Sequence, residues 1–168
     1  GNLKAMAPLP NEEKPNQQYL KTNDFLLTLN AMAVNYYTWV SAVFNRSLLA
    51  PKASFIALTS EGARKAWRFY GAVSAAKAAL EAINRQLAAE LGAHGHRANI
   101  LQPGVTLTPA LKLIPGYQQL LAWAEKRRPS GELTTPQKVA NAVYLLSQPE
   151  SEWINGAIIP VDGGESIA

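Results

Sequence analysis

The stretch "FYGAVSAAKAALEAI", residues 69–83, decides how the rest of the sequence is read. It is rich in alanine and predicts one long helix over residues 70–92, with Gly92 and Gly95 as signals for its end. Tyr70 and Lys77 are seven positions apart in it. Seven residues make about two helical turns, so both side chains share one face, about 10 Å apart along the axis. The two groups can therefore reach a common ligand.

A tyrosine and a lysine so placed can carry out proton transfer. An ammonium group lowers the cost of ionising a nearby phenol, and the amino end of a helix adds positive potential. Tyr70 could then act as a proton donor. One such pair also arises by chance on an alanine-rich helix, so the pair alone leaves a catalytic and an ordinary role both open.

Strand-like segments flank this helix and recur further along the chain. Each is a short apolar run bounded by turn-forming residues. They are "SFIALTS" (54–60), "RANILQPG" (97–104) and "GAIIPVDGG" (156–164). The first of them suits a strand that is buried on both faces.

Further helices alternate with these strands. A helix over residues 23–48, capped by Thr22, Asn23 or Asp24, is apolar nearly all round, which predicts burial or contact with a neighbouring subunit. Residues 110–128 predict one or two short helices. Another helix begins with Thr135 as cap and Pro136 at the first helical position. We expect three of its side chains to face inward: Val139, Val143 and Leu146. This alternation predicts an α/β fold with a parallel sheet covered on both faces.

The composition is that of an ordinary globular domain. The 168 residues are 48% hydrophobic and 17% charged, enough for a single domain over 1–168, in which residues 1–22, with three prolines, form an irregular arm. No apolar run approaches the roughly 20 residues of a membrane span, and no secretory signal is visible, so we expect a cytoplasmic protein. The absence of cysteine excludes disulfides and thiolate chemistry, and two histidines are too few for a histidine-rich metal site.

The net charge of +4 is gathered in two basic clusters. They are Arg64, Lys65 and Arg68, and Lys126, Arg127 and Arg128. Such runs are usually solvated faces, and an acidic protein partner is the alternative. Nucleic acid is an unlikely partner because no recognition motif accompanies the basic residues.

Several separate stretches, in this order, resemble the short-chain dehydrogenase/reductase superfamily. They are Asn30 in the first helix, "IALTS" ending in Ser60, Lys77, "RANILQPGVTLT" and the terminal "INGAIIPVDGG". The common pattern of that superfamily has tyrosine four residues before the lysine, where this chain has Val73. Tyrosine seven before the lysine is similar to the enoyl-acyl-carrier-protein reductase branch, which implies a Rossmann-like three-layer fold and reduction of an enoyl thioester by NADH or NADPH.

The resemblance implies roles for particular residues. Tyr70 would polarise or protonate the thioester carbonyl, Lys77 would hold the nicotinamide ribose, and Ser60 would be a second hydrogen-bonding group. Asn30 would match the helix asparagine of the superfamily, and a buried asparagine bonded to backbone is the alternative.

The segment after the second predicted strand would bind the cofactor. It supplies Pro103, Gly104, Val105 and Thr108, which would approach the nicotinamide carboxamide. A plain turn is the alternative reading of this segment. Asp162, Gly163 and Gly164 resemble a carboxy-terminal signature that serves packing.

The glycine-rich turn that binds pyrophosphate in the family is absent from this sequence. The chain therefore resembles the carboxy-terminal half of a reductase, with residues 23–168 as the catalytic half. A truncated gene, a proteolytic remnant and a partner chain that supplies the missing half all remain open. The helices over 23–48 and 70–92 imply a homo-oligomer, and an acidic acyl carrier protein would be the carrier of the substrate. Another short-chain reductase, acting on a carbonyl or dienoyl substrate, and a non-catalytic binding module are the alternative functions.

Overall fold

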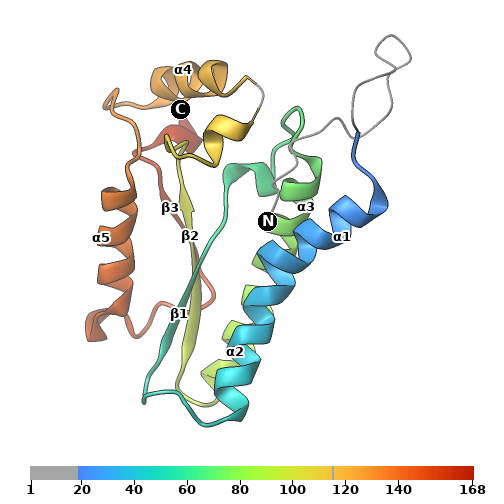
Figure 1. Ribbon diagram of the computed structural model, residues 1–168. Helices are drawn as coiled ribbons and strands as arrows, with labels where there is room; N and C mark the ends of the chain where they lie inside the picture. Colours follow the sequence, from blue (N-terminus) through green and yellow to red (C-terminus); the bar gives the residue numbers. More distant parts are fainter. Residues whose placement is uncertain (1–18, 115) are drawn as a thin grey trace.

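The computed structural model describes residues 19–114 and 116–168, so the predicted arm over residues 1–22 lies almost wholly outside the described residues. Helices and strands alternate along the described chain (Figure 1). The elements are α1 (Thr22–Leu29), α2 (Asn35–Asn45), β1 (Ser54–Leu58), α3 (Gly71–Gly92), β2 (Arg97–Pro103), α4 (Tyr117–Arg127), α5 (Pro136–Ser147) and β3 (Ile158–Val161).

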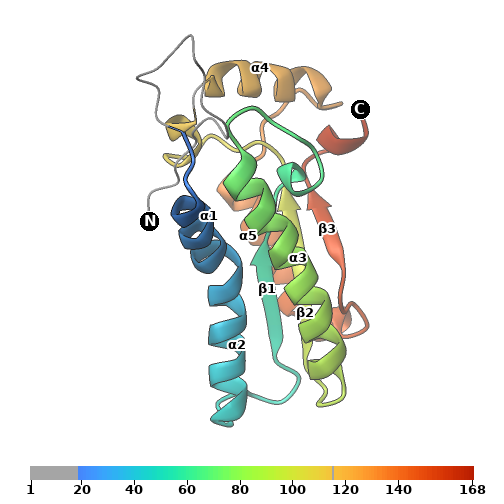
Figure 2. The same ribbon diagram turned by 90° about the vertical axis from the view of Figure 1, so that its right-hand side faces the viewer.

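The three strands form a parallel sheet in the order β1-β2-β3. Helices α1, α2 and α3 cover one face of the sheet, and α5 covers the other (Figures 1 and 2). Helix α4 lies across the end at which the strands finish (Figure 1). The predicted α/β architecture with a covered parallel sheet is therefore confirmed.

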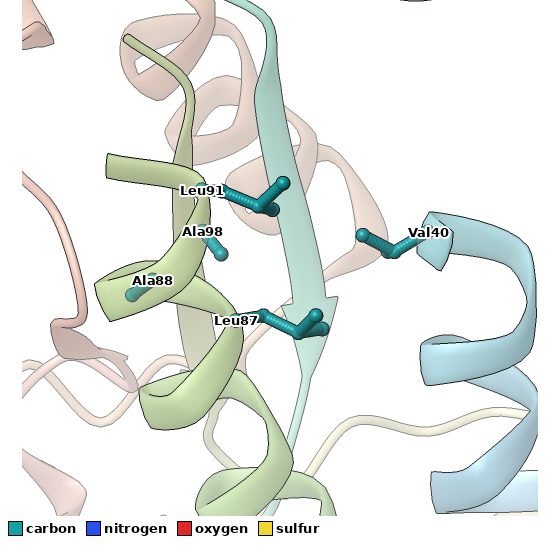
Figure 3. Close-up of a cluster of buried hydrophobic side chains, with 5 residues drawn as sticks. All are labelled: Val40, Leu87, Ala88, Leu91 and Ala98. Atoms are coloured by element: carbon teal, nitrogen blue, oxygen red, sulfur yellow. The ribbon is translucent and has the colours of Figure 1, made fainter. Parts of the chain in front are cut away.

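The core joins α2 and α3 to the central strand. Figure 3 shows one cluster of buried side chains, with Val40 from α2, three residues from α3, and Ala98 from β2. A second cluster contains Ala33, Ala57, Leu80 and Ile100. Because α3 contributes to both clusters, the helix that carries Lys77 is firmly fixed on the sheet.

A buried polar link accompanies this core. The Tyr36 hydroxyl donates to Asn84 Oδ1 at 3.0 Å, and Asn84 Nδ2 donates to the Ala98 carbonyl at 3.2 Å. Burial raises the pKa of the Tyr36 phenol to about 12. The asparagine, which is fully buried, thus satisfies backbone and phenol together.

The first predicted helix differs from the expectation in two ways. A π-helical stretch, Asn30–Val34, interrupts it between α1 and α2. Of the two alternatives predicted from its apolar character, full burial by the described residues is not found, since Leu26, Leu27 and Trp39 remain 59%, 60% and 66% exposed, while contact with a neighbouring subunit stays a prediction. Only one face of α1 and α2 is covered by the described residues. None of the helices in the described ranges is long and apolar enough to cross a membrane.

Two burial predictions were wrong. Strand β1 is only partly buried: most of its residues are half-buried, and Leu58 is 46% exposed. Within the described residues β1 pairs with β2 alone, so it is an edge strand. In α5, Leu146 is buried as expected, but Val143 is 37% exposed. Val139 and Val143 line a cavity instead of the core. The period of a helix identifies its apolar face without showing whether that face meets a core or an open site.

Candidate active site

A cavity of about 630 Å³ lies at the carboxyl ends of β1 and β2, and its walls are mostly apolar. Seven of the eight predicted site residues line it: Ser60, Tyr70, Lys77, Pro103, Gly104, Val105 and Thr108. The carboxyl ends of parallel strands are where open α/β sheets bind their ligands. The volume is in the range of small-molecule sites.

Tyr70 and Ser60 form a hydrogen-bonded pair in this cavity. Their hydroxyl oxygens are 3.1 Å apart, and either group can be the donor. Tyr70 is the residue just before α3 instead of a member of it, and its carbonyl accepts from the Ser74 N–H at 2.7 Å. This contact fixes Tyr70 at the amino end of the helix.

Burial sets the proton affinity of the tyrosine. It raises the pKa of Tyr70, and the hydrogen bond from Ser60 opposes that rise without cancelling it. The expectation that the lysine would ease ionisation of the phenol is therefore not met, because desolvation dominates. A phenol that keeps its proton is suited to donating a hydrogen bond or a proton.

Lys77 lines the same cavity and is half-buried. Its ammonium group donates to the Leu58 carbonyl, at the end of β1, over 2.6 Å. Burial lowers the pKa of Lys77. The lysine is thus fixed to the strand end by one of its three donors, and an ammonium can use the others for a ligand.

The eighth residue is placed elsewhere. Asn30 is the first residue of the π-helical stretch, its side chain is exposed, and it does not line the cavity. The residue that reaches the cavity from this helix is Met32. The alternative of a buried, backbone-bonded asparagine does not apply at Asn30 either.

The segment after β2 is held by a buried ion pair that the sequence did not reveal. Arg128 contacts Glu165, and their side chains are 0% and 4% exposed. Arg128 Nη2 donates to the Val105 carbonyl at 2.7 Å, and the Val105 N–H donates to Glu165 at 3.0 Å. Arg128 had been grouped with a basic surface cluster, so its burial corrects that reading. The pair fixes the orientation of the Val105 peptide.

The backbone donors of this segment are already in use. The Gly104 N–H donates to the Val161 carbonyl at 3.3 Å, and the Val105 N–H is taken by Glu165. Thr108 Oγ1 accepts from the Leu111 N–H at 3.2 Å, which caps the turn Leu111–Leu113. A ligand at Gly104 and Val105 would meet the flat backbone and carbonyl oxygens, which can each accept a second hydrogen bond.

A second network joins the loop after β1 to α4. Arg127 reaches Glu61 through two contacts of 3.2 and 3.3 Å, and Lys65 also pairs with Glu61. Burial would raise the pKa of Glu61, but the two cations together hold it below its usual range. Glu61 lines the cavity, as does its neighbour in the loop, Trp67. Neither had been singled out from the sequence.

The other basic residues are also partnered. Arg64 contacts the buried carboxylate of Glu81 at 3.2 Å, and the guanidinium of Arg68 lies 5.0 Å from the centre of the Phe69 ring. The predicted cluster of Arg64, Lys65 and Arg68 is therefore partly neutralised within the chain.

The parallel sheet, with a tyrosine, a serine and a lysine gathered at its carboxyl edge, defines a protein of the short-chain dehydrogenase/reductase class. The family model described as enoyl-(acyl carrier protein) reductase matches residues 4–166. The chain belongs to this family.

Individual relatives agree with that assignment. The NADH-dependent enoyl-[acyl-carrier-protein] reductase FabI of Escherichia coli is 34% identical over 136 residues, which cover 80% of this chain and 52% of that protein. The crystal structure of the Aquifex aeolicus enoyl-[acyl-carrier-protein] reductase (NADH) superposes with a TM-score of 0.79 at 26% identity, over 89% of this chain and 57% of that one. The Bacillus cereus enoyl-acyl carrier protein reductase, solved with NADP+ and indole naphthyridinone, also gives 0.79 at 26% identity, over 88% and 57%. The chain thus spans about half the length of the relatives it matches.

Proposed function

We propose that residues 23–168 are the catalytic half of a single-domain, NADH- or NADPH-dependent reductase that saturates the carbon-carbon double bond of an enoyl thioester in fatty acid synthesis. The observation that carries the proposal is the Ser60–Tyr70 hydroxyl pair, 3.1 Å apart, in an apolar cavity that Lys77 also lines. The apolar walls suit an acyl chain, and the hydroxyl pair suits the thioester carbonyl.

The reduced nicotinamide, when bound, would supply a hydride to the β-carbon of the unsaturated thioester. Tyr70 Oη would donate a hydrogen bond to the thioester oxygen, where negative charge develops, and uptake of a proton at the α-carbon, from Tyr70 or from solvent, would complete the saturation. The phenol of Tyr70 carries this proton at neutral pH even at the ordinary tyrosine pKa, and burial raises that pKa further. Ser60 holds the hydroxyl of Tyr70 in place and is the second hydrogen-bonding group for the same oxygen.

The residues fit the nicotinamide half of the cofactor in part. Lys77 presents an ammonium group that suits the ribose hydroxyls, and Pro103 and Gly104 present flat backbone to the ring. The carbonyls of Gly104 and Val105 suit the amide donors of a carboxamide, but their N–H groups are engaged within the chain. The sequence contains no glycine-rich pyrophosphate motif, so we expect this chain alone to bind the nucleotide weakly.

The test compares the 168-residue chain with the same chain extended by its upstream reading frame, following oxidation of NADH and NADPH by an enoyl thioester. Tyr70→Phe should lower kcat at least about 100-fold and leave the nucleotide Kd nearly unchanged. Lys77→Ala should weaken both. Tyr144→Phe, at a tyrosine 64% exposed on α5, is the matched control. Equal kcat for Tyr70→Phe and wild type would reject the assignment, and failure of the extended chain to bind either nucleotide would favour a non-catalytic module.

The partner of such an enzyme would be an acyl carrier protein, which is acidic. Arg68 and Lys126 are exposed basic residues suited to its recognition. Arg64 is a poor choice for charge reversal because it balances the buried Glu81. The double variant Arg68→Glu/Lys126→Glu should raise KM for carrier-bound substrate more than for a coenzyme A thioester. An equal rise for both substrates would remove this partner.

The exposed apolar face of α1 and α2 supports a homo-oligomer. Leu27 and Trp39 are among the large apolar side chains that the described residues leave uncovered there. Contact with a second copy would remove this area from water. Leu27→Glu combined with Trp39→Glu should lower the mass measured by light scattering to that of one chain, whereas Trp153→Glu, at a 96% exposed side chain, should not.

A further inference from the structure

We propose that Trp67 is a specificity-determining residue that restricts binding in the cavity to narrow, unbranched acyl chains. The inference rests on the proposed function for the chemical class of the ligand, a thioester. It adds a residue that the sequence did not single out, and a rule for the shape of the acyl chain.

The first support is the position of Trp67 beside the reacting end of the cavity. Trp67 and Tyr70 both line it, and their ring centroids lie 5.6 Å apart with the ring planes tilted by 47°. A thioester whose carbonyl accepts from the Tyr70 hydroxyl must place its first carbons close to the indole. The indole therefore limits the width available at those carbons.

The backbone keeps the two rings together. The Tyr70 N–H donates to the Trp67 carbonyl at 3.2 Å, which closes a tight turn. Phe69, the third residue of that turn, has a φ of +64°, a conformation that glycine adopts readily and bulky residues rarely do. Strained backbone that persists beside a reactive group often has a positioning role. Here it places Trp67 against the proposed proton donor.

A second tryptophan braces the first. Trp67 meets Trp123 of α4 edge-on, with ring centroids 6.3 Å apart. The Arg127 guanidinium lies 4.1 Å from the Trp123 ring centre and also contacts Glu61, two residues into the loop that carries Trp67. The indole of Trp67 thus contacts Tyr70 on one side and Trp123 of α4 on the other. A rigid wall discriminates between shapes better than a flexible one.

The rest of the cavity offers little selection by shape. Several of the other walls are aliphatic, with Val73, Leu113, Ile114 and Leu120 as examples. Such side chains adjust to a ligand more easily than a braced indole. An apolar pocket distinguishes ligands that differ by a methylene by roughly 10- to 200-fold, which sets the scale of the expected effect.

The experiment measures binding of two unreactive thioesters to the 168-residue chain by calorimetry. Octanoyl-N-acetylcysteamine is straight, and cyclohexylacetyl-N-acetylcysteamine has the same number of acyl carbons in a wide form. Wild type should bind the straight probe about tenfold more tightly. Trp67→Leu should abolish or reverse that preference, and Trp67→Phe should reduce it. Trp153→Leu, at a side chain 96% exposed, is the matched control and should leave both Kd values unchanged.

Three results would overturn the inference: no binding of either probe to wild type, equal binding of both, or a Trp67→Leu variant whose two Kd values change by one common factor. Circular dichroism checks the fold of each variant, and Trp67→Phe retains an aromatic ring if the leucine variant unfolds. Because the probes cannot be reduced, the outcome is independent of catalysis. Selective binding, with no NADH- or NADPH-dependent reduction by the chain extended upstream, would leave this inference standing and remove the proposed function. Reduction of straight and wide substrates at rates that do not change when Trp67 is replaced would support the proposed function and overturn this inference.

Discussion

A β-carbon built on Gly62 would lie 2.7 Å from Cδ1 of Tyr70, so the ring of the tyrosine packs directly on the backbone of the glycine. Gly62 is buried and follows Ser60 by two residues, in the turn Glu61–Ala63. The hydroxyl of Ser60 fixes one end of Tyr70, and the glycine leaves room for its ring. The position of the proposed proton donor thus depends on a residue without a side chain.

We predict that Gly62→Ala displaces Tyr70. The added methyl group overlaps the ring, and overpacking of this kind costs about 1–3 kcal/mol. Urea unfolding should detect the loss, and any activity found for the wild type should fall with it. Gly71→Ala is the matched control: its β-carbon would meet only Phe25 Cζ, at 3.9 Å, and alanine favours the helix by up to about 1 kcal/mol. Equal stability of the two variants would contradict the packing argument.

We predict that Arg128 and Glu165 are each needed for stability. Removing one partner leaves the other charge buried and unpaired, which costs about 3–5 kcal/mol. Arg128→Met with Glu165→Leu should cost less than the sum of the two single changes, because neither charge remains. The control is Lys52–Glu152, a pair whose side chains are 74% and 55% exposed, where Glu152→Ala should change stability by less than about 1 kcal/mol. Additive losses at Arg128 and Glu165 would show that the pair is not coupled.

We predict that Lys77→Met stabilises the chain while it removes the proposed cofactor contact. Burial lowers the pKa of Lys77, so the unfolded state holds this proton more tightly than the folded state does. The charged lysine therefore costs stability at neutral pH, and the cost fades as the pH rises through the ordinary lysine pKa. The melting temperature of Lys77→Met should exceed that of wild type at pH 7, and the difference should shrink at pH 10. Lys112→Met, at an exposed lysine, should not show this trend.

The sequence was sufficient for the fold and for placing seven of the eight predicted site residues at the cavity. Alternation of helices and strands predicts a parallel sheet, and parallel strands bring their carboxyl ends to one edge. Ser60 follows the end of β1 and Pro103 is the last residue of β2, so local patterns were enough to place both at the cavity. Asn30 lies on a helix whose turn changes to π, and the shift in phase could not be read from spacing.

The remaining residues depend on contacts that local patterns do not encode. Arg128 and Glu165 are 37 positions apart and meet only when the last turn of the chain packs against the end of α4. One signal for this ion pair was available in the sequence. It was the charged residue Glu165, placed directly after two glycines near the end of an apolar strand. The directions of the pKa shifts of Tyr70 and Lys77 could not be read from the sequence for a similar reason, since desolvation is the largest cause of both and depends on the walls of the cavity.

We predict, finally, that the chain loses stability above pH 10 in a way that depends on Tyr36. Burial raises the pKa of Tyr36 from 10.0 to about 12, so between these values the unfolded state releases a proton that the folded state keeps. Below pH 10 the raised pKa of Tyr36 makes its full contribution to the free energy of unfolding. This contribution falls as the pH rises toward 12, by about 3 kcal/mol in total. Tyr36→Phe should lose about 1 kcal/mol at pH 7 with the hydrogen bond to Asn84, and should show a shallower decline at high pH. Tyr37→Phe, at a side chain 51% exposed, should retain the full decline. Parallel curves for wild type and Tyr36→Phe, measured by urea unfolding across this range, would place the titrating group elsewhere.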